Sequence, residues 1–167
     1  MFRITRAPIA LERLTRAVRD PAAGAIVTFV GTTRNENVGR RVIRLEYEAF
    51  TRMAVAEMKA LAARATRRWR LRRVAMVHRV GVVRIGEASV AIAVSAGHRD
   101  EAFAACRWLI DELKRIVPIW KRERYRGGEE WIGAQQGGPP PRTATAGIRS
   151  RRRSTGGTRA ARRPPRR

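Results

Sequence analysis

The segment Ser89–Ala96 reads SVAIAVSA, an unbroken run of small and β-branched apolar residues. Such a run is typical of a buried strand, and this is the clearest one in the chain. Gly24–Thr33, GAIVTFVGTT, is predicted to be a second buried strand. Val42–Phe50 largely alternates between apolar and polar residues, with Ile43 and Leu45 on the apolar side, which indicates a half-buried third strand.

Three segments between these strands have helical character. Ala10–Arg19 repeats apolar residues at helical spacing. Thr51–Trp69 is rich in Ala, Met and Arg, which are strong helix formers, and Met53 on it is expected to fill the core. A third helix is expected from an N-cap at Asp100 to about Ile116.

Shorter extended segments are expected at residues 2–5, 73–81, 118–125 and 131–132. The resulting order, with hairpin-like neighbours and helical connections, predicts an α+β fold in which a mostly antiparallel sheet packs with about three helices. We expect this single domain to span residues 1–136.

The last part of the chain differs in composition. Gly137–Arg167 contains ten of the 37 basic residues, no acidic residue and one large aliphatic residue. Such a segment cannot bury enough apolar surface to offset the entropy of ordering it, so we predict a disordered tail at 137–167. It is either an arm for nucleic acid or another anionic surface, or a solvated extension without a specific partner.

Composition also excludes several classes of protein. The single cysteine, Cys106, excludes a disulfide framework and a multi-cysteine metal cluster, and with two histidines no metal site is expected. No apolar run reaches the roughly 18–20 residues of a membrane span, and the N-terminus lacks the apolar stretch of a secretory signal. A cytoplasmic location is therefore expected.

Lysine is rare in this arginine-rich chain, with only three among 37 basic residues: Lys59, Lys114 and Lys121. Arginine stays protonated at neutral pH, whereas a lysine in a suitable environment can lose its proton and act as a nucleophile or acid–base group. Lys114 and Lys121 lie seven residues apart in LKRIVPIWKRE. They are either a reactive pair or a chance grouping.

Two further places carry candidate residues. Arg34 follows a predicted strand, and His98-Arg99 lies between a predicted strand and a helix start, where free backbone N–H groups favour anions. If these segments converge with the two lysines, they form a cationic pocket for an anionic substrate. His78 is interpreted as a structural residue within a strand.

At these residues the sequence resembles the large, catalytic subunit of molybdopterin synthase. The resemblance covers about Ala22 to Ile132. Its motifs occur in the family's order and at similar spacing: GAIVTFVGTTRNEN, LEYEAFTRMA, HRVGVVRIGEASVAIAVSAGHRDEAF, IDELKRIVPIWKRE and GGEEW.

The resemblance implies an α/β hammerhead-like fold and an enzyme of molybdenum cofactor biosynthesis. The family forms the dithiolene of molybdopterin by inserting two sulfurs into cyclic pyranopterin monophosphate, without a cofactor of its own. The sulfur arrives as a thiocarboxylate on the C-terminal Gly-Gly of a small ubiquitin-like partner subunit. Two large subunits form the central dimer of a heterotetramer.

The resemblance also implies roles for individual residues. Lys114 matches the family's essential lysine, and Lys121 matches a second active-site lysine. Arg34, His98 and Arg99 match residues that bind the substrate.

Two alternative functions remain open. The chain could be a basic nucleic-acid-binding module that acts through Arg151–Arg153 and the rest of the tail. It could also be an inactive scaffold that binds the small subunit without catalysing sulfur transfer.

Overall fold

The structure is a computed structural model that describes residues 1–132 of the chain. The predicted domain boundary at residue 136 and the predicted disordered tail at 137–167 lie outside the described residues. Within residues 1–132 the chain forms three helices and nine strands in two mostly antiparallel sheets, which confirms the predicted α+β fold. None of these three helices is long and apolar enough to cross a membrane.

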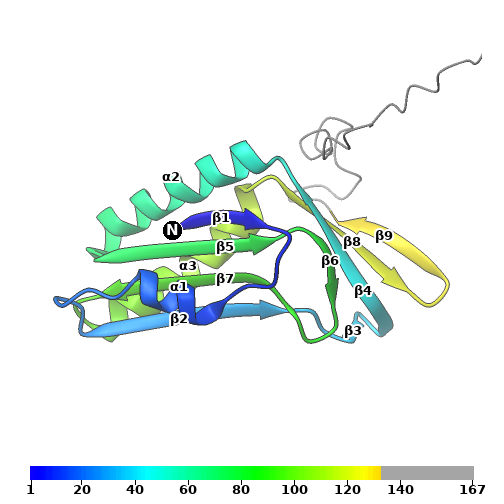
Figure 1. Cartoon of the computed structure of the whole chain (residues 1–167), viewed down its shortest axis with the longest axis horizontal. Coiled ribbons are helices and arrows are strands. Elements are labelled where there is room, and N and C mark those ends of the chain that lie inside the picture. Colours follow the sequence, from blue (N-terminus) through cyan, green and yellow to red (C-terminus); the bar gives the residue numbers. More distant parts are fainter. Residues whose placement is uncertain (133–167) are drawn as a thin grey trace, which may run out of the picture.

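The larger part of the core is built on a four-stranded sheet (Figure 1). Its strands lie in the order β1 (Phe2–Thr5), β5 (Arg73–Arg79), β7 (Ala88–Ala96) and β2 (Ala25–Thr32). β1 pairs with β5 in parallel, and the other pairs are antiparallel. The predicted strand Ser89–Ala96 therefore lies at the centre of the sheet, between β5 and β2.

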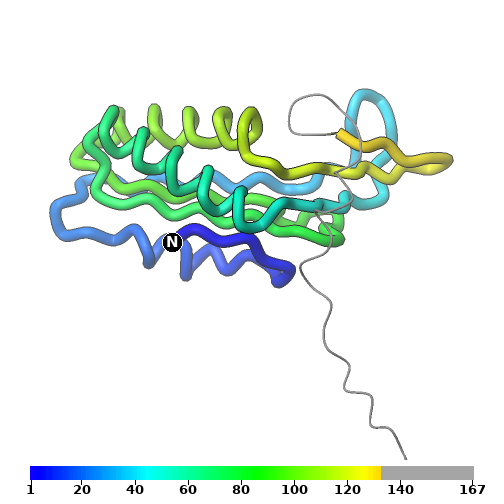
Figure 2. The backbone as a smooth tube through the Cα atoms, turned by 90° about the horizontal axis from the view of Figure 1, so that it is seen from above, coloured from blue at the N-terminus to red at the C-terminus, as the bar shows by residue number. Residues whose placement is uncertain are grey.

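Helices cover both faces of this sheet (Figure 2). α2 (Thr51–Trp69) and α3 (Arg99–Ile116) pack on one face, and α1 (Leu11–Ala17) packs on the other. Along β7, Ile92 contributes to the core under α2 and α3, whereas Ala93 contributes to the core under α1. Burial on both faces explains why β7 is a continuous apolar run, because neither face needs polar side chains.

A second, five-stranded sheet extends from one end of the first (Figure 1). Its main path runs β3 (Glu36–Asn37), β4 (Arg40–Ala49), β8 (Ile119–Tyr125) and β9 (Gly128–Ile132), and β6 (Gly81–Arg84) also pairs with β4. The segment predicted as one strand at 73–81 therefore belongs to two strands. Residues 73–79 form β5 in the first sheet, and Gly81 begins β6 in the second.

The predicted alternation along β4 is wrong at its beginning. The pairing between β4 and β8 shifts register between Val42 and Arg44. Val42 is consequently buried, at 4% exposure, while Ile43 is 55% exposed. A bulge adds one residue to a strand and changes which face the following side chains occupy, and hydrophobic alternation alone does not place it.

Met53 was predicted to fill the core, but it does not lie in the core. It is 56% exposed, whereas Ala54 and Met58 on the same helix are fully buried. Adjacent residues on a helix point about 100° apart, so the stripe that begins at Ala54 leaves Met53 on the flank.

The start of α3 also differs from the prediction. The helix begins at Arg99 with His98 as its N-cap residue, and no side chain caps it by a hydrogen bond. Asp100 lies within the first turn, where its negative charge is favoured by the helix dipole without an N-cap bond.

Candidate active site

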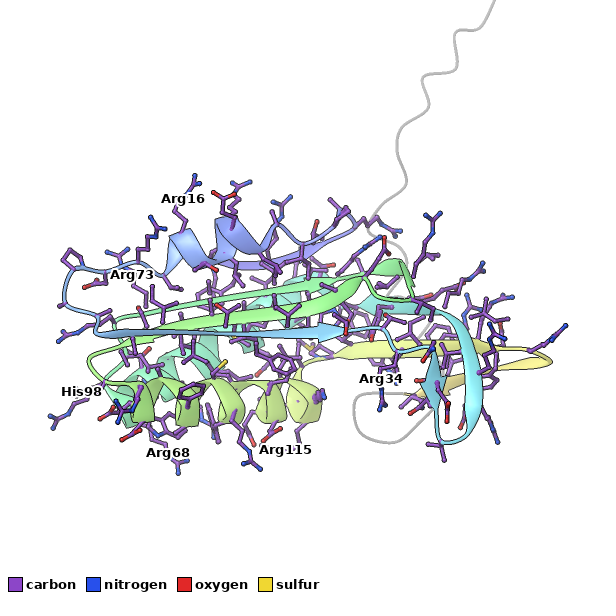
Figure 3. All side chains as sticks on the ribbon, turned by 90° about the horizontal axis from the view of Figure 1, so that it is seen from below. Arg16, Arg34, Arg68, Arg73, His98 and Arg115 are labelled. Carbon is purple, nitrogen blue, oxygen red and sulfur yellow. The ribbon has the colours of Figure 1, made fainter. Side chains whose placement is uncertain are left out.

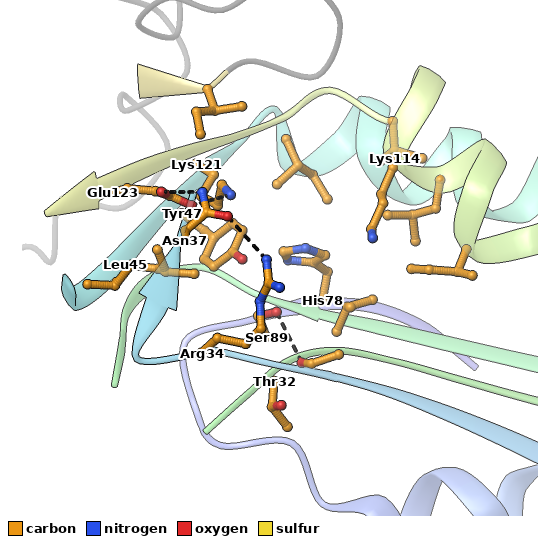
Figure 4. Close-up of a pocket in the computed structure, with 18 of the residues that line it drawn as sticks. Thr32, Arg34, Asn37, Leu45, Tyr47, His78, Ser89, Lys114, Lys121 and Glu123 are labelled. Carbon is orange, nitrogen blue, oxygen red and sulfur yellow. Dashed lines mark hydrogen bonds and ion pairs between the residues drawn. The ribbon is translucent and has the colours of Figure 1, made fainter. Parts of the chain in front are cut away.

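A cavity of about 520 Å³ lies between the two sheets, beside the C-terminal end of α3. Figure 4 shows side chains from both sheets and from α3 pointing into it. Its volume is within the range of small-molecule sites in proteins. The lining residues come from segments far apart in the sequence: Phe29, Gly31, Thr32, Arg34, Glu36, Asn37, Val42, Leu45, Tyr47, His78, Ser89, Val90, Ile110, Leu113, Lys114, Val117, Ile119, Lys121, Glu123 and Ile132.

Lys114 enters the cavity from the last turn of α3. Among residues 1–132 its ammonium has no ion pair or hydrogen bond, so it is available to a bound molecule (Figure 4). The carbonyl end of a helix favours positive charge. The C-terminal turn of α3 is therefore an electrostatically suitable place for a basic side chain.

Lys121 lies across the cavity on β8 and is held by a carboxylate. Its Nζ lies 2.5 Å from Oε1 of Glu123. Glu123 is only 3% exposed, and its other oxygen, Oε2, accepts a hydrogen bond of 2.9 Å from Nδ2 of Asn37. A buried carboxylate with two donors is a fixed anchor, so Lys121 is oriented before any substrate binds.

Arg34 completes a chain of polar contacts along the cavity wall. It follows β2, and its Nη2 donates a hydrogen bond of 3.1 Å to Oδ1 of Asn37. Asn37 thus joins Arg34 to Glu123, and through Glu123 to Lys121 (Figure 4).

Neither Asn37 nor Glu123 was predicted as a site residue from the sequence. For Glu123 a signal existed, since it lies two residues after Lys121 on a predicted extended segment and therefore shares its face. For Asn37 none did, because its position depends on the pairing of the two-residue strand β3 with the start of β4.

His78 also lines the cavity, which its interpretation as a structural residue missed. Its ring is 5.0 Å from that of Tyr47 in an edge-to-face contact, and its Nδ1 lies 2.8 Å from the carbonyl oxygen of Arg79. Burial lowers the pKa of His78 to about 4, so the imidazole is neutral at pH 7. Burial likewise raises the pKa of Tyr47.

His98 and Arg99 are placed elsewhere. Both are exposed at the N-terminal end of α3 and do not line the cavity. Lys114 lies 15 residues further along the same helix, which corresponds to about 22 Å at 1.5 Å per residue. Figure 3 shows His98 at one end of the molecule and Arg34 far from it, in the other half. One chain therefore brings Arg34, Lys114 and Lys121 together without His98 and Arg99.

The charges in the cavity favour an anionic guest. Three cationic side chains, Arg34, Lys114 and Lys121, line it, and the most buried carboxylate, Glu123, is already engaged by two donors. Lys and Arg bind phosphate and carboxylate groups through charge-assisted hydrogen bonds. Within residues 1–132, no three His, Cys, Asp or Glu side chains come together in a way that could hold a metal ion.

Comparison with known proteins identifies the family. The MoaE protein family matches residues 4–116. The molybdopterin synthase catalytic subunit of Bacillus subtilis is 46% identical over 134 residues, which cover 80% of this chain and 85% of that protein.

Solved structures agree with this match. The crystal structure of molybdopterin synthase from Staphylococcus aureus superposes with a TM-score of 0.76 at 34% identity, covering 79% of this chain and 96% of that one. A Helicobacter pylori chain, from a complex of subunits 1 and 2 of molybdopterin-converting factor, shares the fold at 21% identity and a TM-score of 0.62, with 76% and 86% covered. The chain therefore belongs to the MoaE family.

Proposed function

We propose that this chain, a molybdopterin synthase catalytic subunit, transfers sulfur to cyclic pyranopterin monophosphate in the cavity between its two sheets. The donor is the C-terminal thiocarboxylate of a small ubiquitin-like partner subunit. The observation that supports this proposal most directly is that Lys114 and Lys121, from α3 and β8, line the same cavity as Arg34. The phosphate of the precursor and the thiocarboxylate are both anions, which these cations attract.

Lys114 is the group that we assign to the acyl carbon of the thiocarboxylate. Its ammonium is without a bonded partner among residues 1–132, so it can approach negative charge that develops there. It either stabilises that charge or, after losing its proton, is itself transiently acylated.

Lys121 is assigned to proton donation or to the phosphate of the precursor. The contact with Glu123 keeps it oriented, and Arg34 extends the same cationic wall through Asn37. A side chain that is already ordered loses less entropy when it binds a substrate.

The partner assembly is part of the proposal. The C-terminal tail of the small subunit would enter the cavity beside Lys114, and two catalytic subunits would form the centre of a heterotetramer. The Helicobacter pylori structure, which contains two subunits, is in keeping with such an assembly. We propose the cytoplasm as the compartment, as expected from the sequence.

We also propose that His98 and Arg99 serve the cavity of a second copy of the chain, since about 22 Å of helix separates them from Lys114 in their own. Mixed dimers test this proposal. One chain carries His98→Ala with Arg99→Ala, and the other carries Lys114→Ala. Each mixed dimer would contain one complete site, so co-expression should restore activity that both parent variants lack. No restoration would exclude a role across subunits.

The principal test is dithiolene formation from cyclic pyranopterin monophosphate and a thiocarboxylated small subunit. Lys114→Ala should abolish it while preserving the fold and binding of the small subunit. Lys59→Ala is the matched control, because Lys59 is exposed on α2, away from the cavity, and should remain fully active. Near-normal activity of Lys114→Ala would remove the role given to this lysine. Normal partner binding by a wild-type chain that forms no product would instead favour an inactive scaffold.

The nucleic-acid-binding alternative depends on Arg151–Arg153 and the tail, which lie outside the described residues. None of the comparisons above supports it. Salt-dependent DNA binding by the full chain, compared with a chain that ends at Gln136, would test it.

A further inference from the structure

A buried imidazole lines the cavity and is not used by the proposed chemistry. His78 is 5% exposed, lies on β5 and lines the cavity. In the view of Figure 4 its ring lies between the side chains of Arg34 and Lys114. It is therefore placed where a guest of the two lysines would contact it.

The hydrogen bond to the strand determines which ring nitrogen carries the proton. Nδ1 lies 2.8 Å from the carbonyl oxygen of Arg79. A carbonyl oxygen only accepts, so Nδ1 must donate. In a neutral ring the proton is then on Nδ1, and Nε2 presents a lone pair. Nε2 has no hydrogen-bond partner among residues 1–132.

The charged side chains that line the cavity offer no comparable buried acceptor. Arg34, Lys114 and Lys121 are donors. Both oxygens of Glu123 are occupied by Lys121 and Asn37, and the remaining lining carboxylate, Glu36, is exposed to solvent. A phosphate or thiocarboxylate supplies only acceptors, so neither group of the proposed reactants can use Nε2.

We propose that His78 is a substrate-binding residue whose Nε2 accepts a hydrogen bond from an N–H group of the pterin ring. This inference rests on the proposed function, since it takes cyclic pyranopterin monophosphate as the guest. The arrangement divides recognition between two kinds of group. The cations hold the phosphate and the sulfur donor, and the neutral imidazole orients the heterocycle between them.

Two substitutions separate this role from a structural one. In His78→Asn the side-chain amide can still donate to the Arg79 carbonyl, but the acceptor at the Nε2 position is lost. In His78→Gln the amide oxygen can reach the Nε2 position, but the donor to the strand is lost. Our proposal predicts that His78→Asn raises the KM for the precursor about tenfold, the effect of one hydrogen bond, with a smaller change in kcat, and that His78→Gln stays closer to wild type. A purely structural histidine predicts the reverse order, with His78→Gln the more impaired and the less stable.

A measurement that needs no turnover completes the test. In the full-length wild-type chain labelled with ¹⁵N-histidine, titration with cyclic pyranopterin monophosphate should move the Nε2 resonance of His78 in the direction of hydrogen-bond acceptance. An Nε2 resonance that stays constant while calorimetry records binding would overturn the role of His78 and leave the proposed function intact. A resonance already shifted without precursor, and altered by Lys114→Ala, would identify Lys114 as the partner and also overturn it. Absence of precursor binding to the wild-type chain would contradict both proposals.

Discussion

Nζ of Lys121 lies 2.5 Å from Oε1 of Glu123, and the Glu123 side chain is only 4% exposed. The two residues are separated by one position on β8, so their side chains share the face of the strand that lines the cavity. A cation of the proposed active site is thus positioned by a buried anion from the same strand.

Replacing Glu123 by Gln should impair this arrangement. The carboxylate accepts from both Lys121 and Asn37, whereas an amide has one acceptor oxygen and would turn its NH₂ group toward one of these donors. We expect dithiolene formation to fall about 10- to 100-fold, the range for losing a hydrogen bond to a charged group. Glu130→Gln is the matched control, since Glu130 is exposed on β9 and bonds Arg40 and Tyr125 outside the cavity. Equal activity of the two variants would contradict the positioning role.

Lys114→Arg distinguishes the two roles considered for Lys114. Arginine keeps the positive charge but does not lose its proton to act as a nucleophile. Because the carbonyl end of α3 favours a cation at this position, we expect charge stabilisation to dominate. Lys114→Arg should therefore retain measurably more activity than Lys114→Ala in the dithiolene assay. If both variants are equally inactive while still binding the small subunit, transient acylation becomes the better explanation.

The stability of the fold should depend on pH through His78. Burial lowers its folded pKa to about 4, against about 6.5 in the unfolded chain. The unfolded state therefore binds the extra proton between these values, so the free energy of unfolding falls as the pH drops through this window. From this group alone we expect the free energy of unfolding to fall by about 2 kcal/mol between pH 7 and pH 5.

Chemical denaturation at several pH values measures this effect. His78→Asn removes the titrating ring and should flatten the dependence between pH 7 and pH 5. His98→Asn, at the exposed end of α3, is the comparison variant and should retain the wild-type dependence. If the free energy of unfolding changes with pH equally in all three proteins, His78 is not the source of the pH dependence.

Gly24 lies where the backbone before β2 meets the end of β7. A Cβ at Gly24 would lie 2.3 Å from the carbonyl oxygen of Gly97, which is too close for any side chain. Gly24→Ala should therefore lower the free energy of unfolding by about 1–3 kcal/mol, as overpacking does. At Gly97 a Cβ would meet no atom within 4 Å, so Gly97→Ala should lower the free energy of unfolding by less than Gly24→Ala does. Urea denaturation of both variants measures the difference, and an equal loss would argue against this close approach.

Cys106 should be unreactive in the native protein. It lies on the buried face of α3 with 3% exposure, and burial raises the pKa of its thiol to about 11. The thiolate is the reactive form, so little of it exists at pH 8. We expect 5,5′-dithiobis(2-nitrobenzoic acid) to modify Cys106 rapidly in urea and very slowly without it. Rapid modification in buffer alone would show that the core opens locally at α3.

Much of the fold could be predicted from local pattern. Thr51–Trp69 is a helix with the predicted bounds, and Ser89–Ala96 is a central strand, because helix propensity and continuous apolar character are properties of consecutive residues. Ile43 and Met53 were misplaced because a bulge and the angular position of a residue at the edge of a helix stripe depend on partner elements.

The sequence by itself determined the α+β class and, through its motifs, the family, and it singled out Lys114 and Lys121 as candidate site residues. Only the tertiary structure decided that both lysines face one cavity with Arg34, that Asn37 and Glu123 connect this wall, and that His78 lines it while His98 and Arg99 do not. The physical reason is the range of the interactions. Helix and strand preferences act over a few residues, whereas a cavity is made by segments separated by tens of residues whose packing sets which side chains meet.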